Sequence, residues 1–508
     1  MSTTLATAPA PRRTAALLDL ARFEARDLLT QIPVLLFGLL YVLNTADNMF
    51  GGLVGKAEGM DAYPVLQNVD RATQSGALLL SLALLVCVNR AALRSRRQHT
   101  EEQFDVLAMG RARRTLAHAL SVVPYAALSA LLAAVQFGWA ALKPGAAGHG
   151  SVAELAVAPL AVLLSGALAV LLARVAPHPV APALFLVVLY LVVLVLNTLT
   201  SGAHAVQWLW PTVGEFSSDP IPSGLLGRPA AWHALYLAGL TALCVALAVL
   251  VAGGRTGALR AVTVLALAAT AVGAVGQAPG DSARLRAARE AAYRTPEKLQ
   301  SCVDRGGSAY CAFPEWRGWT GHWAAVVDRL QADAGGRAAT VRLTVRQSIG
   351  EVFDLSSDST ALPTRTPDQV TVGTRWGGNR VPEFAVGVAS VLVAGDEDTA
   401  SSMCDARVVT TMWLALGSDP DPLTTFRHLR VDDSLSGSGV VLAPTGSLRV
   451  SAQQTAVVKR LLARPHDEIA ARVKAHWTEL TSSHTTTAQA AKLLGVRVPK
   501  GADDCGGR

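Results

Sequence analysis

Long apolar segments alternate with short polar ones through the first half of the chain. Seven of them reach the length of about 20 residues that a membrane-crossing helix needs. They lie at about 28–46, 74–91, 116–142, 153–174, 182–200, 231–253 and 260–278. The last one is rich in Ala, Gly and Thr, so the pattern fits either six or seven transmembrane helices.

A more polar segment, RRTAALLDLARFEARD at 12–27, precedes the first apolar one. Its apolar residues Leu17, Leu18, Leu20 and Ala21 recur at helical spacing among Arg and Asp, which is typical of a helix lying on a membrane surface. We therefore expect an N-terminal segment with an interfacial helix at 1–27, followed by a transmembrane domain at 28–279.

The pattern changes after residue 280. Charged residues make up 11% of residues 1–279 but 23% of residues 280–508, the value of an ordinary globular domain. A polar helix is predicted at 281–301, and alternation predicts strands at 339–348 and 369–376. Helical spacing recurs at 382–395, 399–416, 451–464, 466–482 and 487–495. The fold class is thus an α-helical multi-pass membrane protein followed by an α+β, mostly helical domain at 280–508.

Basic residues orient the predicted helices. If the N-terminus is cytoplasmic, the inner segments carry 14 Lys and Arg residues and the outer loops carry 4. Basic residues favour the cytoplasmic side, so this orientation in the cell membrane is predicted. Seven helices then place residues 280–508 outside the cytoplasm, whereas six would leave them inside.

The cysteines favour the external placement. Four of the six lie in the C-terminal domain, where Cys302 and Cys311 bracket the turn-forming segment VDRGGSAY. An even number of cysteines in an external region is typical of a disulfide-bonded domain. Cys302 and Cys311 are the candidates for one disulfide, and Cys404 and Cys505 for a second. Four unrelated thiols are the alternative.

Several classes of function are disfavoured, because the chain lacks the residues that they usually require. The apolar cores contain no Asp, Glu, Lys or Arg, which lowers the odds of an ion-driven transporter or pump. The segment GGLVGKA at 51–57 lacks the spacing and the Ser or Thr of an ATP-binding loop. The net charge of +7 lies mostly in short loops between apolar segments, so we expect no nucleic-acid partner.

The loop between the second and third apolar segments, at 89–120, predicts a short cytoplasmic helix at 100–109. Thr100 and Gln103 have the spacing of a capping box, and Gly110 ends the segment. Phe104 and Leu107 fall on one face of this helix, and Glu101 and Glu102 lie elsewhere around it. Such a helix can dock on a cytosolic partner, although a solvated loop without a partner is the alternative.

Here the chain resembles the permease subunits of ABC transporters of the ABC-2 type, particularly those of GC-rich actinobacteria. The surface helix and RSRRQHTEEQFDVLAMGRARRTLAHAL carry the resemblance over residues 12–120. Residues 121–253 share only the arrangement of six helices. The resemblance implies that the loop is the coupling helix that contacts a cytosolic ATPase. The coupling residues would be Glu101, Glu102, Phe104 and Leu107. A seventh helix and the C-terminal domain depart from the minimal pattern of the family.

The C-terminal domain shows no catalytic motif. Its histidines, at 322, 428, 466, 476 and 484, do not form the closely spaced pair of a zinc hydrolase, and no nucleophile motif is present. We therefore expect neither catalysis nor a metal or other cofactor. Trp316, Trp319 and Trp323 fall on one helical face. They fit either a core stripe, or a ligand platform or membrane-facing belt.

Three functions are thus open. The first is an ABC permease subunit in the lipid bilayer, working with a separate cytosolic ATPase as a homodimer or with a second permease. The second is a membrane-anchored extracytoplasmic receptor or assembly module without transport. An ectoenzyme is the third, and the missing motifs disfavour it. The substrate and the direction of transport do not follow from the residues.

Overall fold

The computed structural model describes residues 10–51, 59–100, 109–199, 204–213, 220–349, 366–498, 500 and 502–503. In these residues, seven helices are long and apolar enough to cross a membrane, which indicates a membrane protein. They span Ile32–Phe50, Leu66–Ala92, Arg111–Ala141, Val152–Val175, Ala181–Leu199, Ala230–Val251 and Gly257–Gln277. Each predicted apolar segment is therefore confirmed as a helix, the seventh included.

Two of these helices are composite. The second consists of α3 (Leu66–Ala72) and α4 (Ser75–Ala92), and the short α5 (Arg94–Arg97) follows it. The third consists of α7 (Arg111–Leu120) and α8 (Val123–Ala141). Both begin earlier than hydropathy predicts, because their first residues are polar although helical.

The helix α9 (Val152–Val175) lies in the middle of the bundle and packs against α4, α8 and α12 (Ala230–Val251). Small residues bring helices close together in membranes. A Cβ atom on Gly273 of α13 (Gly257–Gln277) would lie 2.5 Å from the Tyr236 backbone nitrogen, which explains the tight packing of α12 on α13. By contrast, α10 (Ala181–Leu199) and α2 (Ile32–Phe50) expose most of their apolar side chains.

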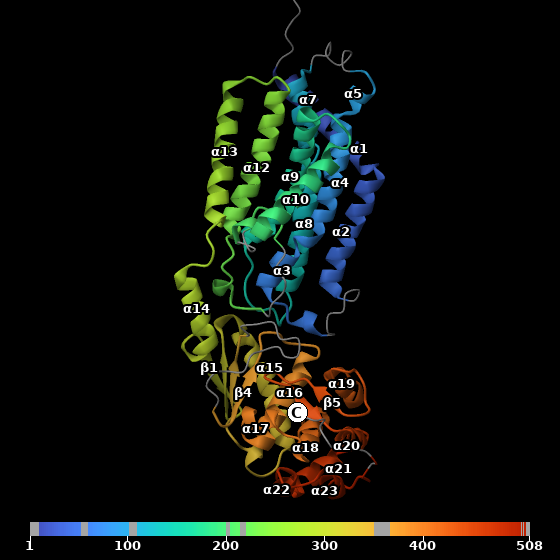
Figure 1. Ribbon diagram of the computed structural model, residues 1–508, viewed down its shortest axis with the longest axis vertical. Helices are drawn as coiled ribbons and strands as arrows, with labels where there is room; N and C mark the ends of the chain where they lie inside the picture. Colours follow the sequence, from blue (N-terminus) through green and yellow to red (C-terminus); the bar gives the residue numbers. More distant parts are fainter. Residues whose placement is uncertain are drawn as a thin grey trace, which may run out of the picture.

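The helix predicted over 12–27 is confirmed as α1 (Ala10–Leu29), called the surface helix below, and it packs along α7. Its place on a membrane surface stays a prediction. It buries Ala21, Ala25 and Leu28 and leaves the other face exposed. The helices α5 and α7 lie at the end of the bundle opposite the C-terminal domain (Figure 1). The helix α14 (Ala283–Arg294) leads from α13 to that domain.

The C-terminal domain contains a four-stranded sheet in the order β1-β2-β3-β4. The strands are β1 (Ser301–Arg305), β2 (Ser308–Ala312), β3 (Thr344–Gln347) and β4 (Gln369–Val372). The β1–β2 pair is antiparallel, and the other two pairs are parallel. The helix α15 (Thr320–Asp333) makes the crossover from β2 to β3, as parallel strands require.

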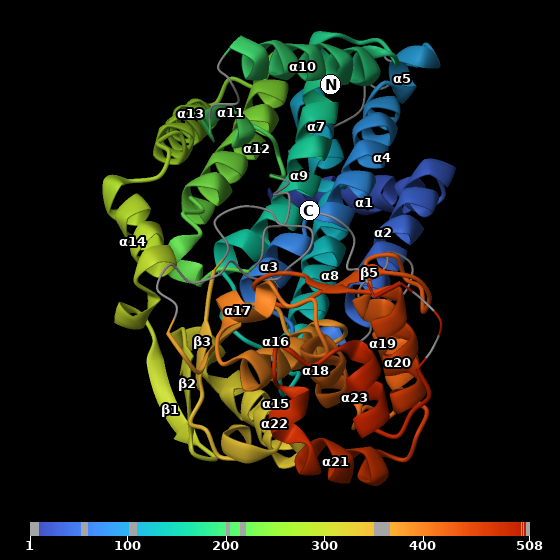
Figure 2. The same ribbon diagram turned by 60° about the horizontal axis from the view of Figure 1, so that its bottom comes forward.

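Helices form the rest of this domain (Figure 2). They are α16 (Arg380–Ala394), α17 (Glu397–Ser401), α18 (Arg407–Leu416), α19 (Pro422–Leu429), α20 (Ala452–Leu462), α21 (His466–Ala475), α22 (Trp477–Leu480) and α23 (Thr487–Leu493). A second sheet pairs β5 (Gly439–Val441) with β6 (Leu448–Val450). One apolar core runs through α15, α16 and α18 and extends to Val65 and Ala147 of the helical bundle's loops.

Several predicted elements are wrong in extent. The helix expected over 281–301 ends at Arg294, because Pro296 follows and Ser301 already begins β1. The helices expected over 399–416 and 466–482 are each two shorter helices. The two predicted strands are confirmed in shortened form, whereas β1, β2, β5 and β6 were not expected.

The three tryptophans belong to the core. Trp316, Trp319 and Trp323 are at most 2% exposed, so the ligand platform and the membrane-facing belt are excluded. They do not share one α-helix either. Trp316 and Trp319 lie in a 3₁₀ helix at Pro314–Trp319, and α15 begins only at Thr320.

Candidate functional site

The predicted docking residues Glu101, Glu102, Phe104 and Leu107 lie outside the described residues, so their role stays a prediction. Both flanks of their loop are described. Before the loop, α5 follows α4 with only Leu93 between them. After the loop, α7 leads into α8. Each flank is therefore joined directly to a membrane-length helix.

An ion pair ties the first flank to the surface helix α1. Arg94 donates a hydrogen bond to Asp27 and lies 3.7 Å from the carboxylate of Glu24. Glu24 is only 7% exposed. Burial raises the pKa of the Glu24 carboxyl; the Arg94 guanidinium opposes this rise, and the Asp27 carboxylate adds to it. Tyr125 of α8 also donates its hydroxyl hydrogen to the Ala25 carbonyl over 2.7 Å. The surface helix is thus fastened to both flanking helices.

The composite helix α3–α4 has α5 and Arg94 at one end. Its other end, α3, lies in a buried network of charged side chains. Arg71 of α3 donates to the Glu154 carboxylate of α9 over 2.9 Å, and the two side chains are 9% and 2% exposed. Gln74 donates to the second Glu154 oxygen over 2.6 Å. Arg71 also donates to the Val213 carbonyl over 3.1 Å and lies 5.2 Å from the centre of the Trp208 ring. This pair fixes α3 against α9.

A second buried pair lies beside the first. Arg228 is 3.5 Å from the carboxylate of Asp70, and neither side chain is more than 8% exposed. The Ser151 amide donates to Asp70 over 2.8 Å, and Arg228 also donates to the Gln67 carbonyl. The loop before α12 is thereby held on α3.

Glu315 connects this network to the C-terminal domain. Gln67 of α3 donates to its carboxylate over 3.0 Å. The amide and hydroxyl of Ser223 donate to it over 3.0 and 2.5 Å. His149 in turn lies 2.9 Å from the Ser223 hydroxyl oxygen. One carboxylate of the 3₁₀ helix therefore contacts two separate segments of the bundle.

Aromatic contacts extend the junction between bundle and domain. Trp319 donates its indole hydrogen to the Gly145 carbonyl over 2.8 Å. The Tyr63 hydroxyl lies 3.3 Å from His322 Nδ1, and its ring packs edge-on against Trp319 and Trp376. The C-terminal domain thus contacts the loop before α3 and the loop after α8. Figure 2 shows this domain against that end of the bundle.

A cavity of about 330 Å³, called the junction cavity below, lies on the bundle side of this junction. Its lining includes Gln67, Asp70, His149, Glu154, Ser223 and Arg228. Burying charged groups costs free energy that their mutual attraction recovers only while the geometry is intact. The network therefore resists any displacement of α3 relative to α9 or to the C-terminal domain.

The sequence did not predict this network. Arg71 and Arg228 are two of the four basic residues of the predicted outer loops, and no role was expected for Asp70 or Glu154. A usable signal was present, because both carboxylates and Arg71 lie at the ends of predicted apolar segments. Charged residues at such positions are equally typical of a solvent-exposed membrane interface, so the sequence did not distinguish a buried ion pair from exposed charges.

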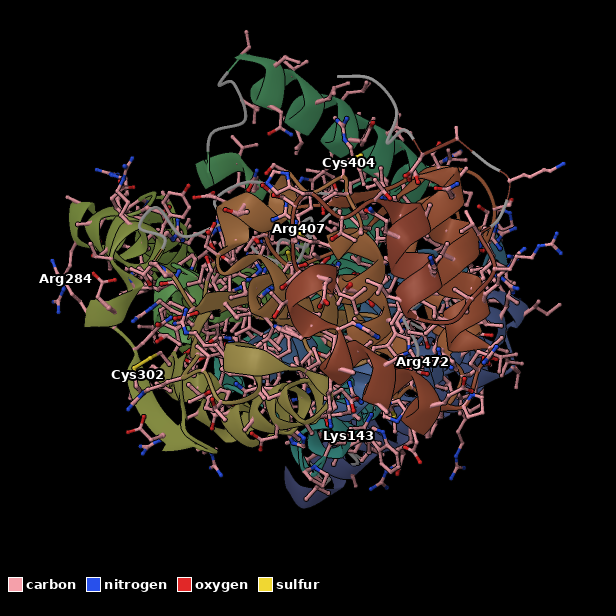
Figure 3. All side chains as sticks on the ribbon, turned by 90° about the horizontal axis from the view of Figure 1, so that it is seen from below. Lys143, Arg284, Cys302, Cys404, Arg407 and Arg472 are labelled. Carbon is pink, nitrogen blue, oxygen red and sulfur yellow. A yellow bond between two sulfur atoms is a disulfide. The ribbon has the colours of Figure 1, made fainter. Side chains whose placement is uncertain are left out.

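The disulfide between Cys302 and Cys311 is present and joins directly opposed residues of β1 and β2 (Figure 3). The segment between them is therefore a hairpin rather than a simple turn. Cys404 also forms a disulfide, whereas Cys505 lies outside the described residues. Cys87 and Cys244 are buried free thiols in the helical bundle.

The histidine-acid cluster at the start of α21 has a structural role. His466 lies 2.9 Å from Asp333 of α15 and stacks on the Trp413 ring at 5.6 Å between centres. Partial burial opposes the charged imidazole, but Asp333 and Asp467 outweigh it and raise the pKa of His466. Within the described part of the chain, no group of three or more His, Cys, Asp and Glu side chains is arranged to hold a metal ion.

Comparisons with protein-family models, curated proteins and solved structures find no match. The class of protein therefore follows from the fold: a bundle of membrane-length apolar helices that carries a disulfide-bonded α+β domain at one end. The two ends of the composite helix α3–α4 are the candidate functional sites of this protein. One carries the buried charge network, and the other leads into the predicted docking loop.

Proposed function

We propose that the chain is the permease subunit of an ABC transporter of the ABC-2 type, driven by a separate cytosolic ATPase. The observation that supports this most directly is the composite second helix. Its outer end, through Gln67, Asp70 and Arg71, belongs to the buried junction. Its inner end, through Arg94, is ion-paired with the surface helix and leads into the predicted docking loop.

This arrangement provides a mechanical path from the loop to the outer domain. An ATPase that closes on ATP would displace the loop 101–108, and with it α5 and α7. Because α4 continues to α3 after a short break, the displacement would reach the Arg71–Glu154 pair. Glu315 would then pass it to the C-terminal domain. We infer that this domain gates or captures the substrate.

The proposed topology has the N-terminus in the cytoplasm and the C-terminal domain outside the cell membrane. The odd number of membrane-length helices and the disulfide at Cys302–Cys311 support it, since disulfides persist in oxidising compartments. Exposed apolar faces on α10 and α13 suit lipid or a second permease subunit. The proposed assembly is a homodimer or a pair with such a subunit.

Recovery of the partner tests the proposal. The tagged full-length chain would be purified in mild detergent from its own cells after mild cross-linking, and the captured proteins identified by mass spectrometry. We expect a protein with nucleotide-binding loops, whose ATP hydrolysis changes when the two are reconstituted together in nanodiscs. Recovery of intact chain without any ATPase would contradict the proposal and favour a membrane-anchored receptor.

A matched pair of variants locates the contact. Phe104→Ala changes the predicted docking loop, whereas Phe50→Ala changes an exposed aromatic residue at the end of α2. The ATPase should be lost from the first variant and retained by the second. Equal recovery with both would remove the loop from the interface.

A further inference from the structure

A second cavity lies at the end of the bundle opposite the C-terminal domain. Its volume is about 690 Å³, within the range of sites that hold small molecules. Five segments line it: the surface helix α1, the α4–α5 corner, the start of α7, the end of α9 and the end of α12. It is separate from the junction cavity, which lies at the other end of α3–α4 and α9.

The lining of this cavity is strongly basic. Five arginines contribute to it: Arg94, Arg96, Arg111, Arg114 and Arg174. Among the described lining residues, Glu24 is the one carboxylate, and it already lies 3.7 Å from Arg94 and 3.9 Å from His118. Arg94 is also ion-paired with Asp27 outside the lining. Basic groups therefore outnumber acidic ones among the described lining residues, which suits an anion in this space.

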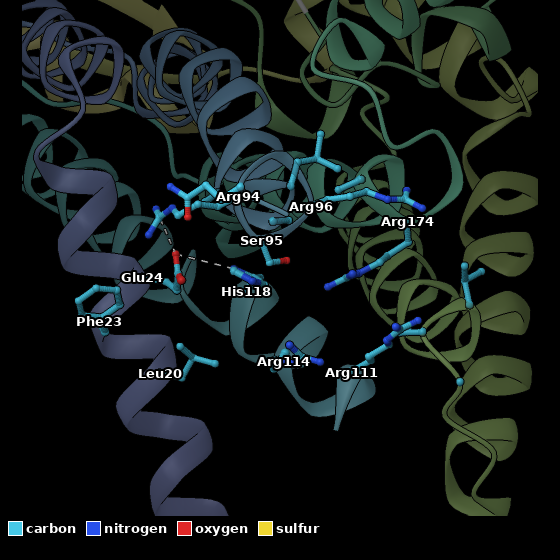
Figure 4. Close-up of a pocket in the computed structure, with 18 residues that line it drawn as sticks. Leu20, Phe23, Glu24, Arg94, Ser95, Arg96, Arg111, Arg114, His118 and Arg174 are labelled. Atoms are coloured by element: carbon cyan, nitrogen blue, oxygen red, sulfur yellow. Dashed lines mark ion pairs between the residues drawn. The ribbon is translucent and has the colours of Figure 1, made fainter. Parts of the chain in front are cut away.

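The arginine side chains converge on the cavity from different elements (Figure 4). Arg114 and Arg111 come from the first turn of α7, and Arg174 comes from the last turn of α9. A guanidinium group presents a planar fork of N–H donors that matches phosphate oxygens, often two at a time. These arginines also have other contacts, which a phosphate oxygen would share. Convergence from separate helices is what a multivalent oxyanion requires.

The lining also has an apolar part. Leu20 and Phe23 of α1 and Val251 of α12 contribute to it, and Phe23 is 59% exposed. A basic pocket bordered by apolar side chains between membrane helices suits a headgroup whose chains stay in the bilayer. We propose that this cavity binds a phosphate group, carried either by an anionic phospholipid or by a soluble phosphate compound.

Binding to the purified full-length chain in detergent tests this without any ATPase. The lipid arm uses dioctanoyl-phosphatidylglycerol, with dioctanoyl-phosphatidylcholine as the neutral control. The soluble arm uses pyrophosphate. Stronger binding of the anionic lipid than of pyrophosphate would identify a lipid headgroup as the ligand, and the reverse order would identify a soluble compound. Both results support the phosphate site.

Two double variants with the same change of charge locate the site. Arg114→Gln with Arg174→Gln removes two cavity arginines, whereas Arg255→Gln with Arg260→Gln removes two exposed arginines outside the lining. The first should weaken binding at least about tenfold, since charge-assisted hydrogen bonds are lost. The second should leave the affinity within about twofold. Equal losses in both variants would show non-specific attraction and overturn the proposal.

Chemical protection covers the case in which the first variant does not fold. In the wild-type chain, the better ligand should protect Arg114 and Arg174 from phenylglyoxal, with Arg255 modified as before. Mass spectrometry of the modified peptides measures this. No binding of either anionic ligand, or binding without protection of the two cavity arginines, would overturn the site. Because no partner subunit is involved, these results are independent of the ABC assignment.

Discussion

Arg71 of α3 and Glu154 of α9 form a buried ion pair across 83 positions of the sequence, with 2.9 Å between donor and acceptor. Removing one partner of a buried pair leaves the other charge uncompensated and costs about 3–5 kcal/mol. We therefore expect Glu154→Gln to lower the unfolding temperature of the full-length chain in detergent markedly.

The exposed pair of Arg22 and Asp19 on α1 is the control, with side chains 73% and 69% exposed. Asp19→Asn should have little effect, because solvent screens such pairs. The double variant Arg71→Met with Glu154→Leu should recover part of the loss, since neither charge is then stranded. Equal stability of Glu154→Gln and wild type would show that the pair does not hold the junction together.

Glu315 should control how tightly the C-terminal domain is held. Its carboxylate accepts hydrogen bonds from Gln67 and Ser223. Glu315→Ala removes this shared acceptor and leaves the buried Gln67 amide with the Ile221 carbonyl alone, at a cost of about 1–3 kcal/mol. We expect trypsin to cleave near the junction faster in this variant than in Glu479→Ala, which changes an exposed carboxylate of the same domain. Identical cleavage rates would argue that other contacts seat the domain.

Thiol labelling tests the placement of the C-terminal domain. In intact cells, a membrane-impermeant maleimide should modify the exposed Cys302 only after treatment with an impermeant reductant, whereas Cys311 is only 1% exposed and should react slowly. Cys87 and Cys244 should stay unmodified, because they are buried in the bundle. Modification of Cys302 that requires opened membranes would place the domain in the cytoplasm.

Phe104→Ala should weaken ATPase docking measurably. Truncating an aromatic anchor in an interface typically costs at least about 2 kcal/mol, or roughly a 30-fold loss of affinity. Replacing Glu101 and Glu102 with lysine should weaken docking further at low salt, where charge effects are screened least. Titration of the purified ATPase against the chain in nanodiscs gives these affinities. Unchanged affinity for Phe104→Ala would remove the coupling-helix assignment.

His466 should make the stability of the C-terminal domain depend on pH. Its pKa is raised above 6.5 in the folded state, because the hydrogen bonds to Asp333 and Asp467 outweigh desolvation. The charged imidazole therefore contributes its full stabilisation below about pH 6.5 and loses it as the pH rises through the folded pKa. We expect the unfolding temperature of the wild type to fall more than that of His466→Gln between about pH 6 and pH 8. Parallel curves for the two proteins would mean that the contact with Asp333 does not depend on charge.

The membrane-length helices could be predicted from hydropathy because an apolar segment of that length has few other structures open to it. The prediction for α10 is within one residue at each end. It fails by several residues at the start of α3, where Gln67, Asp70 and Arg71 interrupt the apolar pattern although they are helical and buried. A hydropathy average cannot distinguish a paired buried charge from a solvated one.

The junction could not be predicted, because its contacts join distant segments. Gln67 and Glu315 are 248 positions apart, and neither residue has an unusual local pattern.

The tryptophans illustrate a related limit of prediction from spacing. Their spacing correctly predicted a common environment, but Pro314 starts a 3₁₀ helix, so a single α-helix was the wrong element. The docking residues at 101–107 stay a prediction.

The core of the C-terminal domain includes Val65 and Ala147, which belong to loops between membrane-length helices. These two residues also pair with each other as a short β-bridge beneath the domain. During synthesis, both leave the ribosome long before residues 301–496, so the domain folds onto a surface that is already assembled. Faulty insertion of α3 or α8 would thus leave the domain's core incomplete, and quality-control proteases would have an exposed apolar surface to recognise. Biogenesis of the C-terminal domain therefore depends on correct placement of the helical bundle.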